Sequence, residues 1–248
     1  MREAADLTGR RALVTGAGVR VGRALALACA DLGMDVAVHY HTSAGAAEAT
    51  AADCRARGRR AVTLGGDLSR AKECRRVARE AEDGLGPIDA LVNSAANFVR
   101  APFAEVSEEQ LDAALAVNVK GPFFMAQALA PGMVARGYGR IVNMTDVAGL
   151  EPWPNFSAHC VSKAGVVMLT RALAQALAPA VTVNAIAPGA VLMPAGTGPD
   201  AARCSADKTV LGRVGEPEDV AEALAYLLRA DYVTGHTLVV DGGRLVRP

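Results

Sequence analysis

Short apolar runs alternate with longer amphipathic segments along almost the whole chain. Most of the short runs are continuously apolar, which is typical of parallel strands that are covered on both faces. The longer segments repeat apolar residues at helical spacing. We expect strands at residues 11–15, 35–40, 61–65, 90–93, 139–144, 181–186 and 238–240. We expect helices at residues 22–31, 43–57, 70–84, 108–135, 160–177 and 217–228.

The order of these elements indicates the fold class. Strands that alternate with helices at this spacing form βαβ units with right-handed crossovers. The expected fold is α/β, a single-domain Rossmann fold whose doubly wound parallel sheet of about seven strands has helices on both faces. No linker, repeat or change of composition divides the chain, so we expect one domain over residues 1–248. The Gly- and Pro-rich stretch 188–199 is too long for an ordinary connection, and it predicts a substrate loop at about residues 190–211.

Composition and charge argue against several classes of function. The 26 basic and 26 acidic residues balance and are scattered, which argues against a nucleic-acid partner. The five cysteines show no CxxC spacing, so we expect neither a disulfide framework nor a metal site. The charged N-terminus lacks the apolar core of a signal peptide, and no apolar run approaches the roughly 20 residues of a membrane span. We expect a soluble cytoplasmic protein without a membrane partner.

A glycine-rich turn follows the first expected strand, and Gly16, Gly18 and Gly22 lead into the first helix. Glycine lets the backbone turn tightly and approach a pyrophosphate, which the helix N-terminus favours through its free N–H groups and dipole. The alternative is an ordinary glycine-rich turn, but the strand before it and the helix after it favour a dinucleotide site. The spacing TGxGxxxG departs from the usual GxGxxG, because Arg20 stands where a middle glycine often lies.

The end of the second strand bears on the choice of cofactor. Residues 36–43 contain no Asp or Glu where a ribose 2′-hydroxyl would be held. A carboxylate there selects NAD, whereas Arg20 with the hydroxyls of Thr42 and Ser43 suits a 2′-phosphate. The sequence therefore predicts NADP(H).

Two polar residues follow later strands. Asp67 comes after the third strand, where its carboxylate could accept from the adenine amino group or instead cap a helix or turn. Asn93 ends the fourth strand, and we expect its segment to pass beside the cofactor's ribose.

Further motifs run along the chain in a fixed order: the turn 15–22, Asp67-Leu68, Asn93-Ser94-Ala95-Ala96, Asn118-Val119-Lys120-Gly121-Pro122, Ile141-Val142-Asn143-Met144, Pro188-Gly189, and an ending that joins Val233-Thr234-Gly235 to Val240-Asp241-Gly242-Gly243. In order and separation they resemble the short-chain dehydrogenase/reductase family over essentially the full length of the chain. The resemblance implies an oxidoreductase in which a nicotinamide cofactor supplies the hydride. It places the cofactor against Gly16, Arg20, Val21, Tyr40, His41, Thr42, Ser43, Asp67, Leu68, Asn93, Ala95, Lys163, Pro188 and Gly189.

Within that family the motifs are most similar to the pteridine reductases. That subgroup also carries Arg inside the glycine turn and His-Tyr-His after the second strand, here at residues 39–41. It has Asp where most relatives have the catalytic Ser, here Asp146, and it stacks an aromatic ring on the pterin, here Phe98. Packing within a loop is the alternative role for Phe98.

The resemblance places the active site at Asn118, Asp146, His159 and Lys163. Asp146 and His159 keep the family's separation from Ser or Asp to Tyr, and Lys163 follows four positions later on the same helix face. The tyrosine itself is replaced by His159. An imidazole can also donate a proton near neutral pH, and the charges of Asp146 and Lys163 would shift its pKa in opposite directions.

Three interpretations of His159 stay open. It is the replacement acid or a hydrogen-bonding partner of the substrate, or Asp146 or water delivers the proton and His159 only lines the site, or reductase activity is lost. The leading hypothesis is hydride transfer from NADPH to a C=N or C=O bond of a small substrate. Phe98, Asp146 and His159 would then surround a flat heterocycle such as a dihydropterin.

Two further hypotheses and an assembly state accompany this one. Reduction of a 3-oxoacyl thioester or a natural-product ketone is the second enzyme hypothesis. A non-catalytic NADP(H)-binding sensor or partner subunit is the third. Because family members usually assemble through the helices that match residues 108–135 and 160–177, we expect a homotetramer or homodimer.

Overall fold

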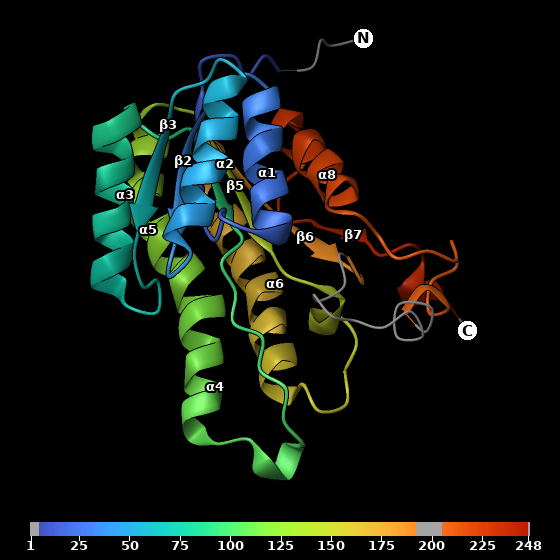
Figure 1. The fold of residues 1–248 in the computed structure, drawn as a ribbon. Coiled ribbons are helices and arrows are strands. Elements are labelled where there is room, and N and C mark those ends of the chain that lie inside the picture. The colour runs from blue at the N-terminus through green and yellow to red at the C-terminus, as the bar shows by residue number, and fades with distance from the viewer. Residues whose placement is uncertain (1–4, 192–204, 248) are drawn as a thin grey trace.

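The computed structural model describes residues 5–191 and 205–247, and its centre is a parallel sheet of seven strands in the order β3-β2-β1-β4-β5-β6-β7 (Figure 1). This topology confirms the expected doubly wound Rossmann fold. The strands are β1 Arg11–Val14, β2 Asp35–Tyr40, β3 Ala61–Gly65, β4 Ala90–Asn93, β5 Gly139–Met144, β6 Val181–Pro188 and β7 Thr237–Val240.

Helices cover both faces of the sheet (Figure 1). Helices α1, α2 and α8 pack on one face, and α3, α5 and α6 pack on the other. Their bounds, with those of α4, are α1 Arg20–Asp31, α2 Ala44–Ala56, α3 Ala71–Leu85, α4 Glu108–Leu115, α5 Gly121–Ala135, α6 Ser157–Leu177 and α8 Pro217–Arg229.

Strand β2 shows why the strands read as continuous apolar runs. Val36 and Val38 belong to the hydrophobic cluster under α1, α2 and α8, while Ala37 belongs to the cluster under α3, α5 and α6. Successive side chains of a strand point to opposite faces, so a strand buried on both faces needs apolar residues at every position. His39 breaks this run although it is fully buried.

The expected helix at residues 108–135 is the main correction to the predicted elements. The chain forms two α-helices there, α4 and α5, joined by a π-helical turn at Ala116–Lys120. Pro122 lies at the start of α5 and has no N–H to donate to the Asn118 carbonyl, which favours a departure from regular α-helix at this point. Asn118 is thereby presented from an irregular turn, where sequence periodicity predicts only continuous helix.

Two expectations concern residues near the C-terminal half. Most of the expected substrate loop at 190–211 lies outside the described residues. At its start, Val191 forms a β-bridge with Gly215.

The helix α6 is long and apolar enough to cross a membrane, with a mean hydropathy of 1.2, which corrects the expectation that no apolar run is long enough. One such helix is weak evidence for a membrane span, and here α6 packs against β6 in the core.

Candidate cofactor cleft and active site

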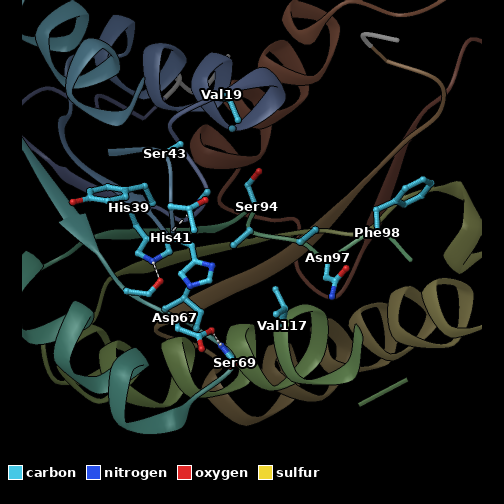
Figure 2. Close-up of a pocket in the computed structure, with 18 of the residues that line it drawn as sticks. Val19, His39, His41, Ser43, Asp67, Ser69, Ser94, Asn97, Phe98 and Val117 are labelled. Atoms are coloured by element: carbon cyan, nitrogen blue, oxygen red, sulfur yellow. Dashed lines mark hydrogen bonds between the residues drawn. The ribbon is translucent and has the colours of Figure 1, made fainter. Parts of the chain in front are cut away.

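A cleft of about 870 Å³ opens where the strand order reverses between β1 and β4 (Figure 2). It lies at the carboxyl ends of the strands, the usual place of ligands in open α/β sheets. Its volume is in the range of known small-molecule and cofactor sites. In Figure 2, His39, His41 and Ser43 gather at one end, Phe98 lies at the other, and Ser94 and Asn97 lie between them.

The glycine turn lines the cleft and requires glycine at two of its positions, Gly16 and Gly22. Gly16 has a left-handed backbone with φ of 64°, and a Cβ there would lie 2.9 Å from the Cα of Ala95. A Cβ on Gly22 would lie 2.0 Å from the Gly16 carbonyl oxygen, closer than atoms can approach. At the start of α1 no side chain of the described residues caps the helix at Val19. The start of a helix is a favourable place for a pyrophosphate, and Val19, Arg20 and Val21 at this helix start line the cleft.

The side chain of Thr15 connects the glycine turn to the loop after β4. Its hydroxyl oxygen accepts hydrogen bonds from the backbone N–H groups of Ser94 (2.9 Å) and Ala95 (3.0 Å). The loops after β1 and β4 are therefore held together at the switch point, and both line the cleft.

Asp67 lines the cleft at the end of β3. Its carboxylate accepts from the Ser69 N–H at 3.1 Å and lies 3.5 Å from the Arg70 guanidinium. Burial alone would raise the pKa of this carboxyl, but the Ser69 hydrogen bonds and the charges of His41 and Arg70 lower it overall. Asp67 is thus an ionised turn acceptor, with its side chain also on the cleft wall.

The four predicted active-site residues converge beside the Phe98 end of the cleft. Asp146 follows β5, and His159 and Lys163 lie one turn apart on the inner face of α6. Nε2 of His159 lies 2.6 Å from Oδ2 of Asp146. The His159 side chain is 2% exposed and that of Asp146 is 19% exposed. The other carboxylate oxygen of Asp146 accepts from the Ala148 N–H at 2.6 Å.

Two polar atoms of this cluster bear on what it can do chemically. Nδ1 of His159 is buried and has no hydrogen-bond partner among the described residues. The ammonium of Lys163 donates to the Met144 carbonyl at 2.9 Å. Burial lowers the pKa of Lys163, and the negative charge of Asp146 opposes that shift.

Asn118 links the cluster to the cleft wall. Its side-chain oxygen accepts from the Asn97 N–H (2.7 Å), and its amide donates to the Asn97 carbonyl (2.9 Å) and to the Ser162 hydroxyl (2.9 Å). Ser162 in turn donates to the His159 carbonyl at 2.7 Å. Asn118 therefore fixes the Asn97 backbone against α6.

An aromatic surface borders the same end. Phe98 is 59% exposed, lines the cleft, and meets the His159 ring edge-on with centroids 4.6 Å apart. The ring of Phe156 also packs against Phe98, with the two ring centroids 4.9 Å apart. A half-exposed ring held by two other rings offers a flat apolar face to a ligand.

The structure brings most, but not all, of the predicted cofactor residues to the cleft. Asn93 does not line it, because its side chain donates to Asn143 within the sheet. Lys163, Pro188 and Gly189 also lie outside its described lining. The predicted residues that do line it are Gly16, Arg20, Val21, Tyr40, His41, Thr42, Ser43, Asp67, Leu68, Ala95 and Phe98.

Sequence reasoning missed several lining residues. Asn97 directly follows a predicted motif and could have been found by extending it. Asp112 and Val117 come from α4 and the π-helical turn and carry no local signal. His39 also lines the cleft, and the signal that could have found it is a titratable side chain inside an apolar strand.

Comparison with known proteins gives consistent matches along the chain. A family model described as enoyl-(acyl carrier protein) reductase matches residues 16–244. The 3-oxoacyl-(acyl-carrier-protein) reductase FabG of Staphylococcus epidermidis is 33% identical over 239 residues, covering 94% of this chain and 98% of that protein.

Solved structures match equally widely. A protein from Sinorhizobium meliloti 1021 that is described as a short-chain alcohol dehydrogenase matches with a TM-score of 0.93 and 38% identity. The match covers 98% of this chain and 99% of that one. A blue fluorescent protein from a metagenomic library, solved in complex with NADPH, has a TM-score of 0.90 and 31% identity, covering 97% and 99%.

Proposed function

The chain belongs to the short-chain dehydrogenase/reductase family, and on this basis we propose that it uses NADPH to reduce a planar, pteridine-like heterocycle. Membership makes the protein an oxidoreductase that depends on a nicotinamide cofactor. The proposal adds the phosphorylated form of that cofactor, the class of substrate and the source of the proton.

The choice of NADPH rests on the end of the cleft where β2 finishes. Arg20, His41, Thr42 and Ser43 line it, and residues 39–43 include no carboxylate that would repel a 2′-phosphate. A guanidinium and hydroxyl groups are good partners for phosphate oxygens. Arg20→Ala should weaken NADPH binding by about tenfold or more and leave NADH binding nearly unchanged. Equal losses for the two cofactors would contradict this assignment.

The choice of a planar substrate rests on one observation, the exposed ring of Phe98 beside His159 and Asp146. Stacking on such a ring favours flat heterocycles. The partly exposed carboxylate of Asp146 can accept from ring N–H groups, which pterins carry.

The proton comes from the Asp146–His159 pair. When bound, the cofactor supplies the hydride. Because His159 is buried and its Nε2 faces Asp146, the partly exposed Asp146 is the member that can contact a substrate. We assign the shared proton to transfer through Asp146 to the substrate nitrogen or oxygen, while His159 holds and replenishes it. Lys163 places a positive charge near the carboxylate that this transfer leaves behind.

Reduction of a 3-oxoacyl thioester is the second candidate. The observation that favours it is the likeness to the Staphylococcus epidermidis FabG over nearly all of both chains. Against it stands Phe98, whose exposed ring on the cleft wall favours a flat heterocycle over an acyl chain.

The test is NADPH consumption by the purified protein with dihydrobiopterin, dihydrofolate or an acetoacetyl thioester. We expect turnover of the dihydropterins, and Phe98→Leu should raise their KM by about tenfold. Tyr232→Leu is the matched control, since this ring is also exposed but does not line the cleft.

Other outcomes would overturn the proposal. Turnover of the acetoacetyl thioester alone would establish the 3-oxoacyl reductase. Tight NADPH binding without turnover of any substrate would favour the non-catalytic NADP(H)-binding protein.

A further inference from the structure

We propose that His39 is a positioning residue for the cofactor, whose neutral imidazole holds the glycine turn and the end of β3 in the arrangement that receives the dinucleotide. The inference requires only that the cleft binds a nicotinamide dinucleotide, so it is independent of the substrate and of the active-site proton.

The imidazole bridges two walls of the cleft. Its Nδ1 lies 3.2 Å from the backbone nitrogen of Gly16, and its Nε2 lies 3.1 Å from the carbonyl oxygen of Gly66. Figure 2 shows the ring of His39 at the end of the cleft with its bond to the β3 side drawn. The two glycines belong to loops after β1 and β3, which β2 separates in the sheet.

These partners fix one tautomer. The Gly16 N–H can only donate, so Nδ1 must accept, and the Gly66 carbonyl can only accept, so Nε2 must carry the hydrogen. Both ring nitrogens are satisfied only in the neutral form. Burial lowers the pKa of His39 to about 4, the Gly66 bond opposes this shift, and the charges of His41 and Arg76 add to it.

The contact acts on the part of the turn whose geometry is most demanding. Gly16 has a left-handed φ of 64° and begins the run of residues that lead into α1. The ring fixes the orientation of the Gly16 peptide, while the backbone carbonyl of His39 accepts from the Ala17 N–H at 2.8 Å. The peptides that follow are thereby held ready for phosphate oxygens, which reduces the ordering cost of binding.

The second contact aligns the opposite wall. Gly66 precedes Asp67 and Leu68, both of which line the cleft. The Gly66 N–H also donates to the Tyr40 carbonyl at 3.0 Å, so the β3 end is attached to β2 at two points. His39 therefore sets the spacing between the glycine turn and the loop after β3.

Two substitutions separate the two contacts. In His39→Asn, the side-chain oxygen takes the place of Nδ1 and can accept from Gly16, but the side chain is too short for Gly66. In His39→Gln, the amide can reach toward Gly66 while the acceptor for Gly16 is displaced. We expect His39→Asn to bind NADPH about threefold more weakly than the wild type, because the Gly66 contact is lost, and His39→Gln to bind about tenfold more weakly, because the Gly16 contact is lost. Kinetics should show the same order, with the KM for NADPH rising more in His39→Gln than in His39→Asn.

A matched control separates cofactor positioning from general stability. Asn184 is also buried, on β6, which like β2 lies next to an edge strand of the sheet. Its side chain makes two hydrogen bonds with backbone groups of Val233 and His236, away from the cleft. Asn184→Leu should lower the unfolding free energy without changing the Kd for NADPH. The proposal fails if His39→Gln binds NADPH as tightly as His39→Asn, or if Asn184→Leu weakens NADPH binding as much as His39→Gln does.

Discussion

The imidazole of His159 is buried, while the carboxylate with which it shares a hydrogen bond is partly exposed. The proposed mechanism uses this difference in exposure to give the two residues different roles. In the proposed mechanism Asp146 contacts the substrate, whereas His159 acts through Asp146. The bond from the Ala148 N–H orients the carboxylate independently of His159.

Substitutions at the two positions should therefore differ in effect. Asp146→Asn keeps the acceptor for Ala148 but removes the acid, so kcat should fall by about a hundredfold or more while the Kd for NADPH stays the same. His159→Ala should lower kcat less, since Asp146 stays oriented. Steady-state kinetics with a dihydropterin checks both values. Should His159→Tyr raise activity while His159→Ala leaves it unchanged, His159 would have no part in proton delivery.

Buried His39 makes the stability of the protein depend on pH. Its pKa is about 4 in the folded chain and 6.5 ordinarily, so the unfolded chain binds the proton more readily. The stabilisation is complete above pH 6.5 and is lost as the pH falls toward 4, by about 3 kcal/mol in all. Denaturant titrations at pH 7 and pH 4.5 should show a smaller loss for His39→Asn than for the wild type. An equal loss in both proteins would mean that other groups cause the decline.

At the scale of elements, the turn between β1 and α1 depends on a close approach that no side chain permits. A Cβ on Gly22 would overlap the Gly16 carbonyl oxygen, so Gly22→Ala must displace the first turn of α1 from the cleft floor. NADPH binding, measured by fluorescence titration, should be lost. Gly45→Ala is the control, because nothing lies within 4 Å of a Cβ there. That change in α2 should leave binding intact and stabilise the protein by about 0.5–1 kcal/mol.

The π-helical turn between α4 and α5 is the element that periodicity did not reveal. Apolar residues recur through residues 108–135 as in one helix. Pro122 marks the interruption, but Pro131 gives the same local signal and α5 continues through it, so proline alone does not locate the turn. The widened turn places the Asn118 side chain where it makes hydrogen bonds with Asn97 and with Ser162. A contact between three segments so distant in the chain follows from packing alone.

At the scale of the whole molecule, an apolar groove of about 370 Å³ runs between the start of α4 and the start of α6. Phe103, Leu111 and Val161 line it and are exposed. Apolar patches of this kind mark protein interfaces, and the groove lies on the helices through which we expect the oligomer to form. We propose that a second copy of the chain covers it.

Val161→Lys should shift the protein to a smaller species in size-exclusion chromatography with light scattering, because a charge in an apolar contact is costly. Val161 is 58% exposed, and Tyr226 on α8 is similarly exposed at 54% but lies outside the groove. Tyr226→Lys should therefore leave the mass unchanged. A wild-type protein that elutes as a monomer at all concentrations would rule out this interface.

Local signals in the sequence are enough to predict the parallel sheet, the alternation of its strands with helices, and the glycine turn. Four of the seven expected strands match the observed bounds, because continuous apolar runs and glycine spacing are local signals. The family motifs likewise predict from spacing alone that Asp146, His159 and Lys163 stand at the active-site positions.

The contacts between those residues depend on how the elements pack in the folded chain. In the folded chain, His159 shares a hydrogen bond with Asp146, and Asn93 donates one to Asn143. The side chain of His39 makes hydrogen bonds with both Gly16 and Gly66. Each of these outcomes joins residues from different strands or loops, and their hydrogen-bond partners are chosen by packing rather than by neighbours in the chain. Local pattern identifies an element, but it does not carry the distances between elements that set a site's chemistry.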